Sequence, residues 1–151
     1  MNILFVCTGN TCRSCMAEAI FNSICDIDGV RAYSAGISIV PGSKTSKHSA
    51  SLVMNNLSHD ISERSAVQLT SDMIGNADLI LTMTNYMRDL IASNFHEKSN
   101  NVFSLCEYAG VNGEISDPYG GSIDVYSKTY DQLKNIIGKV LIKIKEDKGI
   151  F

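Results

Sequence analysis

A cysteine, an arginine and a serine near the amino terminus have the types and spacing for chemistry on an anion. Cys7 follows the apolar run 3–6, and Arg13 and Ser14 come shortly after it. The apolar run is typical of a strand, and apolar residues recur at helical spacing after Ser14. The sequence therefore predicts a strand that ends at Cys7, a tight loop and then a helix over about residues 14–27.

A loop of this kind favours an anion because it curls directly into a helix N-terminus, where several main-chain N–H groups have no intrahelical partner. The helix dipole adds partial positive charge, and the Arg13 guanidinium offers paired donors to phosphoryl oxygens. The same field favours the thiolate of Cys7, which is the form that attacks phosphorus. Ser14 can donate a hydrogen bond to that sulfur. Gly9 and Asn10 are residue types that tolerate the positive φ that such a loop requires.

A buried structural cysteine before an ordinary turn is the alternative reading of Cys7. A lone cysteine and arginine at this spacing favour that alternative, and only their position at a strand-to-helix junction favours the chemical one. The sequence contains no G-x4-G-K-[ST] pattern, so a Walker A nucleotide loop is excluded.

Two segments resemble the low-molecular-weight protein tyrosine phosphatases, in particular their bacterial branch, which includes protein arginine phosphatases. These segments are residues 2–18, NILFVCTGNTCRSCMAE, and residues 117–121, DPYGG. The resemblance covers nearly the whole chain in length and in the order of its elements. It implies a phosphoprotein phosphatase that forms a phosphocysteine intermediate, with phosphorylated proteins as its partners.

The resemblance also implies the roles of the site residues. Cys7 is the expected nucleophile, Arg13 holds the phosphoryl oxygens, and Asp117 is the general acid that later serves as base. An Asp-Pro pair is by itself only a common start of a turn, so the role of Asp117 rests on the resemblance. The expected substrate-binding residues are Thr8, Gly9, Asn10, Thr11, Cys12, Ser14 and Tyr119. We expect no metal and no other cofactor, because main-chain amides and Arg13 supply the positive field.

The residue type at Thr11 indicates which substrate to expect. Tyrosine phosphatases of the family generally carry a bulky aliphatic residue at this place, whereas the arginine phosphatases carry threonine. We therefore favour protein phosphoarginine over phosphotyrosine, and both remain open. The alternative role of Thr11 is that of a loop hydroxyl bonded to its own backbone.

Three other functions remain open from the sequence. Cys12 and Cys15 form a C-x2-C pattern at a helix N-terminus, where the family usually has proline in place of Cys15, and this pattern suggests a thiol-disulfide oxidoreductase. An arsenate reductase shares the same loop but needs two distal relay cysteines, and Cys106 is the one distal cysteine. A non-catalytic phosphate-binding module would not need both Cys7 and Asp117.

The remaining pattern predicts strands that alternate with helices, and therefore a mostly parallel sheet with helices on both faces. We expect an α/β fold, a single three-layer domain over residues 1–151, with the phosphate loop after the first strand. His48 is expected to be structural rather than part of the site. Further strands are expected at 30–35, 64–69, 78–83 and 101–105; loops at 37–47 and 106–113; and helices at about 50–57, from Thr70, from Thr84 to Phe95, and from Ser122 to Ile144.

The composition indicates which partners and which cellular compartment to expect. The chain of 151 residues is 44% hydrophobic with a formal net charge of −3, which gives no basic excess for nucleic acid. The amino terminus lacks a signal-peptide pattern, and no apolar run is long enough for a membrane span. The five cysteines lack zinc-site spacing and suit reduced thiols. We therefore expect a cytoplasmic monomer with neither nucleic acid nor membrane as partner.

Overall fold

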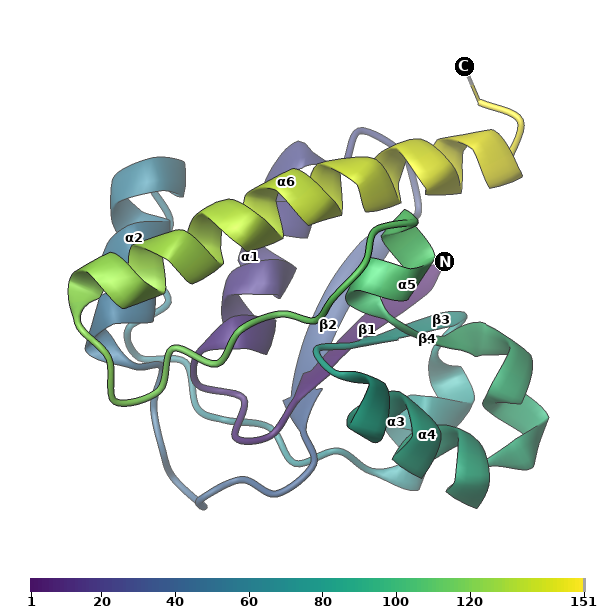
Figure 1. Ribbon diagram of the computed structural model, residues 1–151, viewed down its shortest axis with the longest axis horizontal. Helices are drawn as coiled ribbons and strands as arrows, with labels where there is room; N and C mark the ends of the chain where they lie inside the picture. The colour runs from purple at the N-terminus through teal and green to yellow at the C-terminus, as the bar shows by residue number, and fades with distance from the viewer. Residues whose placement is uncertain (151) are drawn as a thin grey trace.

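A four-stranded sheet forms the centre of the molecule (Figure 1). The computed structural model describes residues 1–150. The strand order is β2-β1-β3-β4, and each pair of neighbouring strands is parallel. The strands are β1 (Asn2–Cys7), β2 (Arg31–Gly36), β3 (Leu79–Thr82) and β4 (Val102–Ser104). The predicted fold class, a single α/β domain with a parallel sheet, is confirmed.

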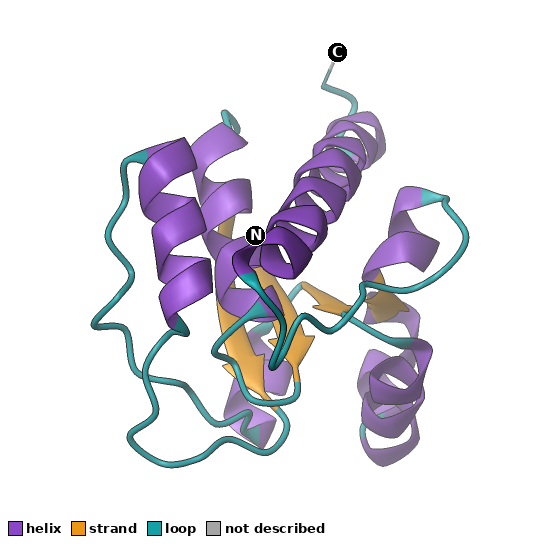
Figure 2. Ribbon diagram, turned by 60° about the vertical axis from the view of Figure 1, so that its left-hand side comes forward, coloured by secondary structure: helices purple, strands orange, loops and turns teal. Residues whose placement is uncertain are grey.

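Helices cover both faces of this sheet (Figure 2). One face packs against α1, α2, α5 and α6, and the other packs against α3 and α4. Their bounds are α1 (Arg13–Ile24), α2 (Lys47–Leu57), α3 (Ser71–Asn76), α4 (Asn85–Asn94), α5 (Leu105–Ala109) and α6 (Ile123–Asp147), with a 3-10 helix, η1, at His96–Asn101. This arrangement makes the three layers.

The central strand β1 is apolar on both sides because both of its faces are covered. Ile3 and Phe5 belong to the core beneath α1 and α6, while Leu4 and Val6 belong to the core beneath α3 and α4. All four are at most 3% exposed. A continuous apolar run is what a strand in such a position requires.

Threonine and serine side chains cap the N-termini of several helices. The side chains of Thr70, Thr84 and Ser122 each accept a hydrogen bond from an amide in the first turn of the helix that follows. Such caps satisfy amides that have no intrahelical partner. The predicted starts of α3, α4 and α6 are confirmed.

The longest helix, α6, has one buried side and one polar side. Tyr130, Leu133 and Ile137 are at most 2% exposed, while the opposite side carries lysines and aspartates. Within residues 1–150, no helix is both long enough and apolar enough to cross a membrane.

Two predicted segments are wrong. Residues 64–69 are not a strand, because only isolated bridges, Gly36 with Gln68 and Lys44 with Ser65, involve them. Residues 105–109 form α5 instead of a turn-rich connection, since Ser104 and Glu107 make a reciprocal capping box that stabilises this short helix. The helix after the loop also ends earlier than predicted, at Ile24.

Candidate active site

The loop between β1 and α1 lies at the carboxyl edge of the sheet, which is where parallel α/β folds bind ligands. Its one left-handed residue is Asn10, with φ of 56°. Gly9 does not have a positive φ, so of the two residues expected to tolerate this conformation only Asn10 adopts it. A single left-handed residue turns the chain, and Asn tolerates that conformation better than most side chains.

The loop packs tightly against the end of β2. A Cβ atom on Gly36 would lie 2.6 Å from the carbonyl oxygen of Thr8, so this position has no room for a side chain. The next amides continue the contact, because Ile37 N donates to Cys7 O and Ser38 N donates to Thr8 O, both at 3.0 Å. These bonds fix the start of the loop relative to the sheet.

The sulfur of Cys7 has two polar neighbours. Ser14 Oγ lies 2.8 Å from it, and Asn10 N donates to it at 3.2 Å. Asn10 Nδ2 also donates to Ser14 Oγ at 2.7 Å, which leaves the hydroxyl proton of Ser14 free to point at the sulfur. Two donors aimed at one sulfur stabilise negative charge on it.

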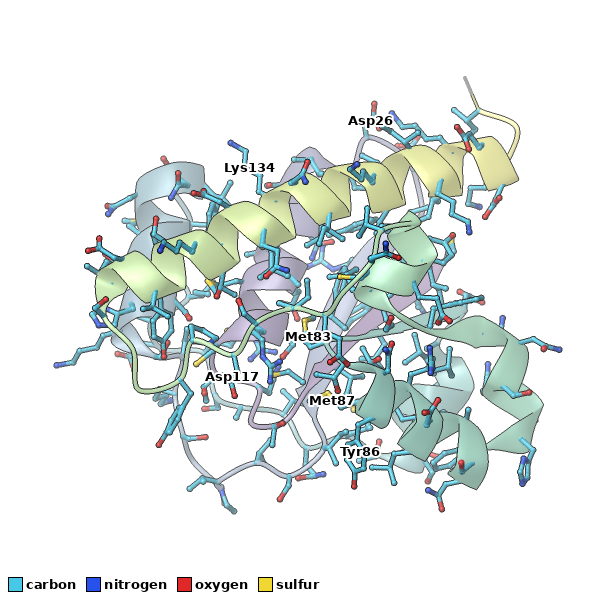
Figure 3. The ribbon with its side chains drawn as sticks, viewed as in Figure 1. Asp26, Met83, Tyr86, Met87, Asp117 and Lys134 are labelled. Carbon is cyan, nitrogen blue, oxygen red and sulfur yellow. The ribbon has the colours of Figure 1, made fainter. Side chains whose placement is uncertain are left out.

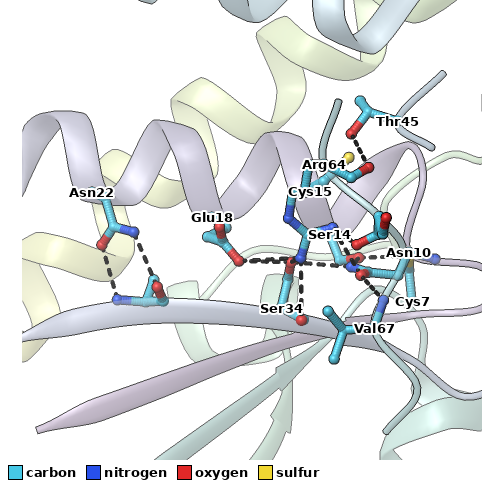
Figure 4. A network of polar contacts seen from close by, with 12 residues as sticks. Cys7, Asn10, Ser14, Cys15, Glu18, Asn22, Ser34, Thr45, Arg64 and Val67 are labelled. Carbon is cyan, nitrogen blue, oxygen red and sulfur yellow. Dashed lines mark hydrogen bonds and ion pairs between the residues drawn. The ribbon is translucent and has the colours of Figure 1, made fainter. Parts of the chain in front are cut away.

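A buried hydrogen-bond network fixes the orientation of the Asn10 side chain (Figure 4). Its Oδ1 accepts from Arg64 Nη1 and from Val67 N, both at 2.9 Å. Its Nδ2 donates to Ser34 Oγ at 3.0 Å, and Ser34 Oγ in turn donates to Glu18 at 2.8 Å. Because each amide atom has its own partners, the amide cannot flip without losing bonds.

Arg13 is held by the segment that leads into α6. Its Nη1 donates to Ile115 O at 3.1 Å, and its Nη2 lies 3.7 Å from Asp117 Oδ2. The Arg13 side chain is 6% exposed and that of Asp117 is 57% exposed, so the carboxylate stands at the open end of the pair. The Asp117 Oδ1 atom accepts from Tyr119 N at 3.1 Å, which orients the carboxylate. Figure 3 shows Asp117 on this segment, beside the loop that follows β1.

These residues surround a cavity of about 530 Å³. The structure brings together nearly all of the residues predicted for the site. Those that line the cavity are Cys7, Thr8, Gly9, Asn10, Thr11, Cys12, Arg13, Asp117 and Tyr119. Ser14 does not line it, because this fully buried residue lies behind the Cys7 sulfur. The catalytic and binding roles of these residues stay predictions.

Sequence reasoning missed two sets of residues around the site. The first set, Glu18, Ser34 and Arg64, supports Asn10 and comes from three different elements or segments. The second set lines the cavity from the segment between β2 and α2 and comprises Ser38, Val40, Ser43 and Lys44. No local spacing signals either set.

Cys15 and Cys106, the cysteines on which the two redox alternatives depend, have no exposed thiol. Cys15 is 1% exposed, its thiol donates to Cys12 O at 3.1 Å, and burial raises its pKa. Cys106 is also 1% exposed, and burial raises its pKa as well. Buried thiols that hold their protons are poor nucleophiles, so neither the oxidoreductase nor the arsenate reductase alternative is favoured.

Tyr126 of α6 contacts the loop between β1 and α1 at Cys12. Its hydroxyl lies 3.3 Å from Cys12 Sγ, and burial together with this contact raises its pKa to about 12. His48 packs its ring edge against the Tyr126 ring, with centroids 5.1 Å apart, and it does not line the cavity. This position is consistent with a structural His48.

Fold and site together define a class of protein: a parallel α/β domain with a cysteine at the base of an anion-binding loop, beside an arginine and a carboxylate. The chain belongs to the low molecular weight phosphotyrosine protein phosphatase family, whose model matches residues 2–149. The predicted family is thereby confirmed.

Two relatives are similar over nearly their whole length. A protein-arginine-phosphatase of Bacillus subtilis (strain 168) is 40% identical over 151 residues, which cover 98% of this chain and 99% of that protein. The low molecular weight protein-tyrosine-phosphatase PtpB of Staphylococcus epidermidis is 43% identical over 143 residues, which cover 95% of this chain and 99% of that protein.

A solved structure is also similar. It is a C7S mutant of the YwlE arginine phosphatase with a phosphorylated active-site serine. It superposes with a TM-score of 0.88 at 39% identity, and the match covers 97% of each chain.

Proposed function

We propose that this protein is a phosphoprotein phosphatase that removes phosphate from protein phosphoarginine or phosphotyrosine through a phosphocysteine at Cys7. The observation that carries the proposal is the position of the Cys7 sulfur. It lines the cavity and has donors from Ser14 and Asn10 behind it. A thiolate held in this way is stabilised as a nucleophile and has an open path to a substrate.

In the first step, the Cys7 thiolate attacks phosphorus and the bond from phosphorus to the leaving nitrogen or oxygen breaks. Arg13 and the main-chain amides at the start of α1 hold the equatorial oxygens, since this helix has no side-chain cap on its first amides. Asp117 gives its proton to the leaving group. Its position in the cavity lining and its exposed side chain support this role.

In the second step, water attacks the phosphorus of the phosphocysteine. Asp117, now ionised, takes a proton from that water, and the bond from sulfur to phosphorus breaks. The thiolate then leaves, with the bonds from Ser14 Oγ and Asn10 N stabilising its charge. Inorganic phosphate is released, and the enzyme returns to its starting state.

Phosphoarginine is the substrate we favour, with phosphotyrosine as the second candidate. Thr11 lines the cavity, and its hydroxyl contacts Cys12 Sγ at 3.7 Å, a weak bond that a substrate group can displace. A hydroxyl there suits a polar guanidinium better than an aliphatic side chain does. Both activities occur among the relatives, as a protein-arginine-phosphatase and a protein-tyrosine-phosphatase.

We further infer that the protein acts on phosphorylated proteins in the cytoplasm, as a monomer that contacts neither nucleic acid nor membrane. Its five cysteines are free thiols, which suits a reducing compartment.

The experiment is phosphate release from matched phosphoarginine and phosphotyrosine peptides by the wild-type protein and by Cys7→Ser. We expect rapid release by the wild type and almost none by the variant, together with a phosphorylated variant detectable by intact-protein mass spectrometry. Equal rates for the two proteins would exclude the covalent mechanism. A strong preference for the phosphotyrosine peptide would exclude phosphoarginine as the main substrate.

A further inference from the structure

The segment between β2 and α2 forms one wall of the cavity, and this wall has a fixed main chain. Ala66 N donates to Ser43 O at 2.8 Å, and Thr45 N donates to Arg64 O at 3.1 Å. Lys44 lies between these two bonds and lines the cavity. These main-chain hydrogen bonds to residues 64–66 therefore fix the backbone of Lys44 in the wall.

The Lys44 ammonium has polar partners but no counter-charge. Its Nζ donates to Glu63 O and to Ser65 Oγ, each at 3.1 Å, and both acceptors are neutral. Within residues 1–150, the cations in ion pairs are Arg13, Arg64, Arg88 and Lys145, and Lys44 is not among them. An ammonium has three donors, so one N–H of Lys44 is available to a ligand.

The charges around the cavity leave this cation unbalanced. Arg13 lies 3.7 Å from Asp117 Oδ2 in the free protein, and its charge is engaged by the phosphoryl oxygens when a substrate is bound. Lys44 is then the remaining charge of the wall. The whole chain carries a formal net charge of −3 and thus repels acidic peptides at long range. A preference for an acidic peptide must therefore come from a local cation.

The residue before Lys44 in this wall has a side chain without a hydrogen-bond partner among residues 1–150. The hydroxyl oxygen of Ser43 is buried, and it makes no hydrogen bond within the described part of the chain. Buried polar atoms without partners are rare in folded proteins. The Ser43 hydroxyl oxygen is closed off from solvent, so of these two neighbours it is the exposed Lys44 that a ligand can reach.

We propose that Lys44 is a specificity-determining residue that selects substrates with an acidic side chain next to the phosphorylated residue. The inference rests on the proposed function, because it concerns the same cavity. When the phosphoryl group lies at the base beside Cys7 and Arg13, the residues that flank it in the substrate lie at the rim. An aspartate or glutamate there meets the free N–H of Lys44.

The test compares kcat/KM for peptides that differ only by Glu or Gln in the position before or after the phosphorylated residue. Because an exposed ion pair is weak, the wild type should prefer Glu by about twofold to fivefold at low salt in one of the two positions. The preference should disappear in about 0.5 M salt, which screens exposed charges. Lys44→Met should abolish it, and Lys44→Arg should keep it.

Lys47→Met is the matched control, since Lys47 is an exposed lysine in the first turn of α2 that does not line the cavity. It should keep the preference of the wild type. The inference is wrong if the wild type hydrolyses the Glu and Gln peptides equally well, or if Lys44→Met keeps the preference. Failure of the wild type to release phosphate from any of the peptides would instead contradict the proposed function.

Discussion

Ser14 Oγ lies 2.8 Å from Cys7 Sγ, and Nδ2 of the Asn10 side chain donates to that same oxygen at 2.7 Å. The donor from Asn10 leaves the Ser14 hydroxyl proton to the sulfur. The serine therefore stabilises the thiolate and not the thiol. This contact matters most in the second step, when the sulfur is the leaving group.

Ser14→Ala should lower kcat by roughly 10²-fold, which is the lower end of the loss when one aligned donor to a developing charge is removed. The loss should fall mainly on hydrolysis of the phosphocysteine. Rapid-quench kinetics should show a stoichiometric burst of dephosphorylated product followed by a slow phase. A variant that hydrolyses the intermediate at the wild-type rate would contradict this role of Ser14.

Asp117→Asn should slow the reaction of phosphoarginine and phosphotyrosine peptides by about 10²-fold to 10⁴-fold, because a carboxamide has no acidic proton to transfer to the leaving group. An aryl phosphate whose phenol is strongly acidic should lose much less in the first step, because such a leaving group departs without a proton. Asp124→Asn, in the first turn of α6, is the control and should retain normal activity. Equal losses for good and poor leaving groups would argue against Asp117 as the acid.

Thr11→Ile should shift the ratio of kcat/KM toward phosphotyrosine and away from phosphoarginine. The added bulk and the lost hydroxyl both make the wall less suitable for a guanidinium. Thr11→Val separates the two effects, because it keeps the shape and removes only the hydroxyl. The measurement is the ratio for matched peptides, and a ratio unchanged in both variants would exclude Thr11 as a determinant of the substrate.

Alkylation by iodoacetamide near neutral pH should modify Cys7 and leave Cys15 and Cys106 unmodified. The sulfur of Cys7 faces the cavity, while burial raises the pKa of the Cys15 and Cys106 thiols. Peptide mapping by mass spectrometry identifies the modified positions. Inorganic phosphate should protect Cys7, because it occupies the same loop. Rapid labelling of Cys15 in the native protein would reopen the redox alternative.

Stability should fall in alkali between about pH 10 and about pH 12. Burial raises the pKa of Tyr108 and Tyr126 to about 12 in the folded protein, whereas an unfolded tyrosine titrates near 10. Between these values the unfolded chain binds fewer protons than the folded one, so the free energy of unfolding decreases as pH rises. Urea unfolding at a series of pH values measures this slope.

Tyr126→Phe should make that slope shallower, because it removes one of the groups with a raised pKa. Tyr86→Phe is the control, since Tyr86 is 74% exposed, and it should leave the slope unchanged. A slope that Tyr126→Phe does not alter would mean that its hydroxyl titrates alike in the folded and unfolded states.

The two segments that the sequence analysis predicted wrongly have different causes. Residues 64–69 have strand-like composition, but a strand exists only where a neighbouring strand pairs with it, and pairing here is limited to isolated bridges. Helix α5, Leu105–Ala109, is too short for a helical period to be recognised, and its cap is what marks it. The strand was excluded by tertiary pairing, whereas the spacing of Ser104 and Glu107 is a local signal of the helix that the sequence analysis overlooked.

The sequence by itself determined the strand, loop and helix that present Cys7 and Arg13, because these residues are close in the chain and covalent geometry with local hydrogen bonds fixes their relative positions. Only the tertiary structure decided which distant residues contact this strand, loop and helix. Arg13 binds Ile115 across 102 residues, and Arg64 binds Asn10 across 54 residues. Lys44 reaches the cavity through the pairing of its segment with residues 64–66. Such distant contacts depend on how the helices pack on the sheet, and no spacing along the chain encodes them.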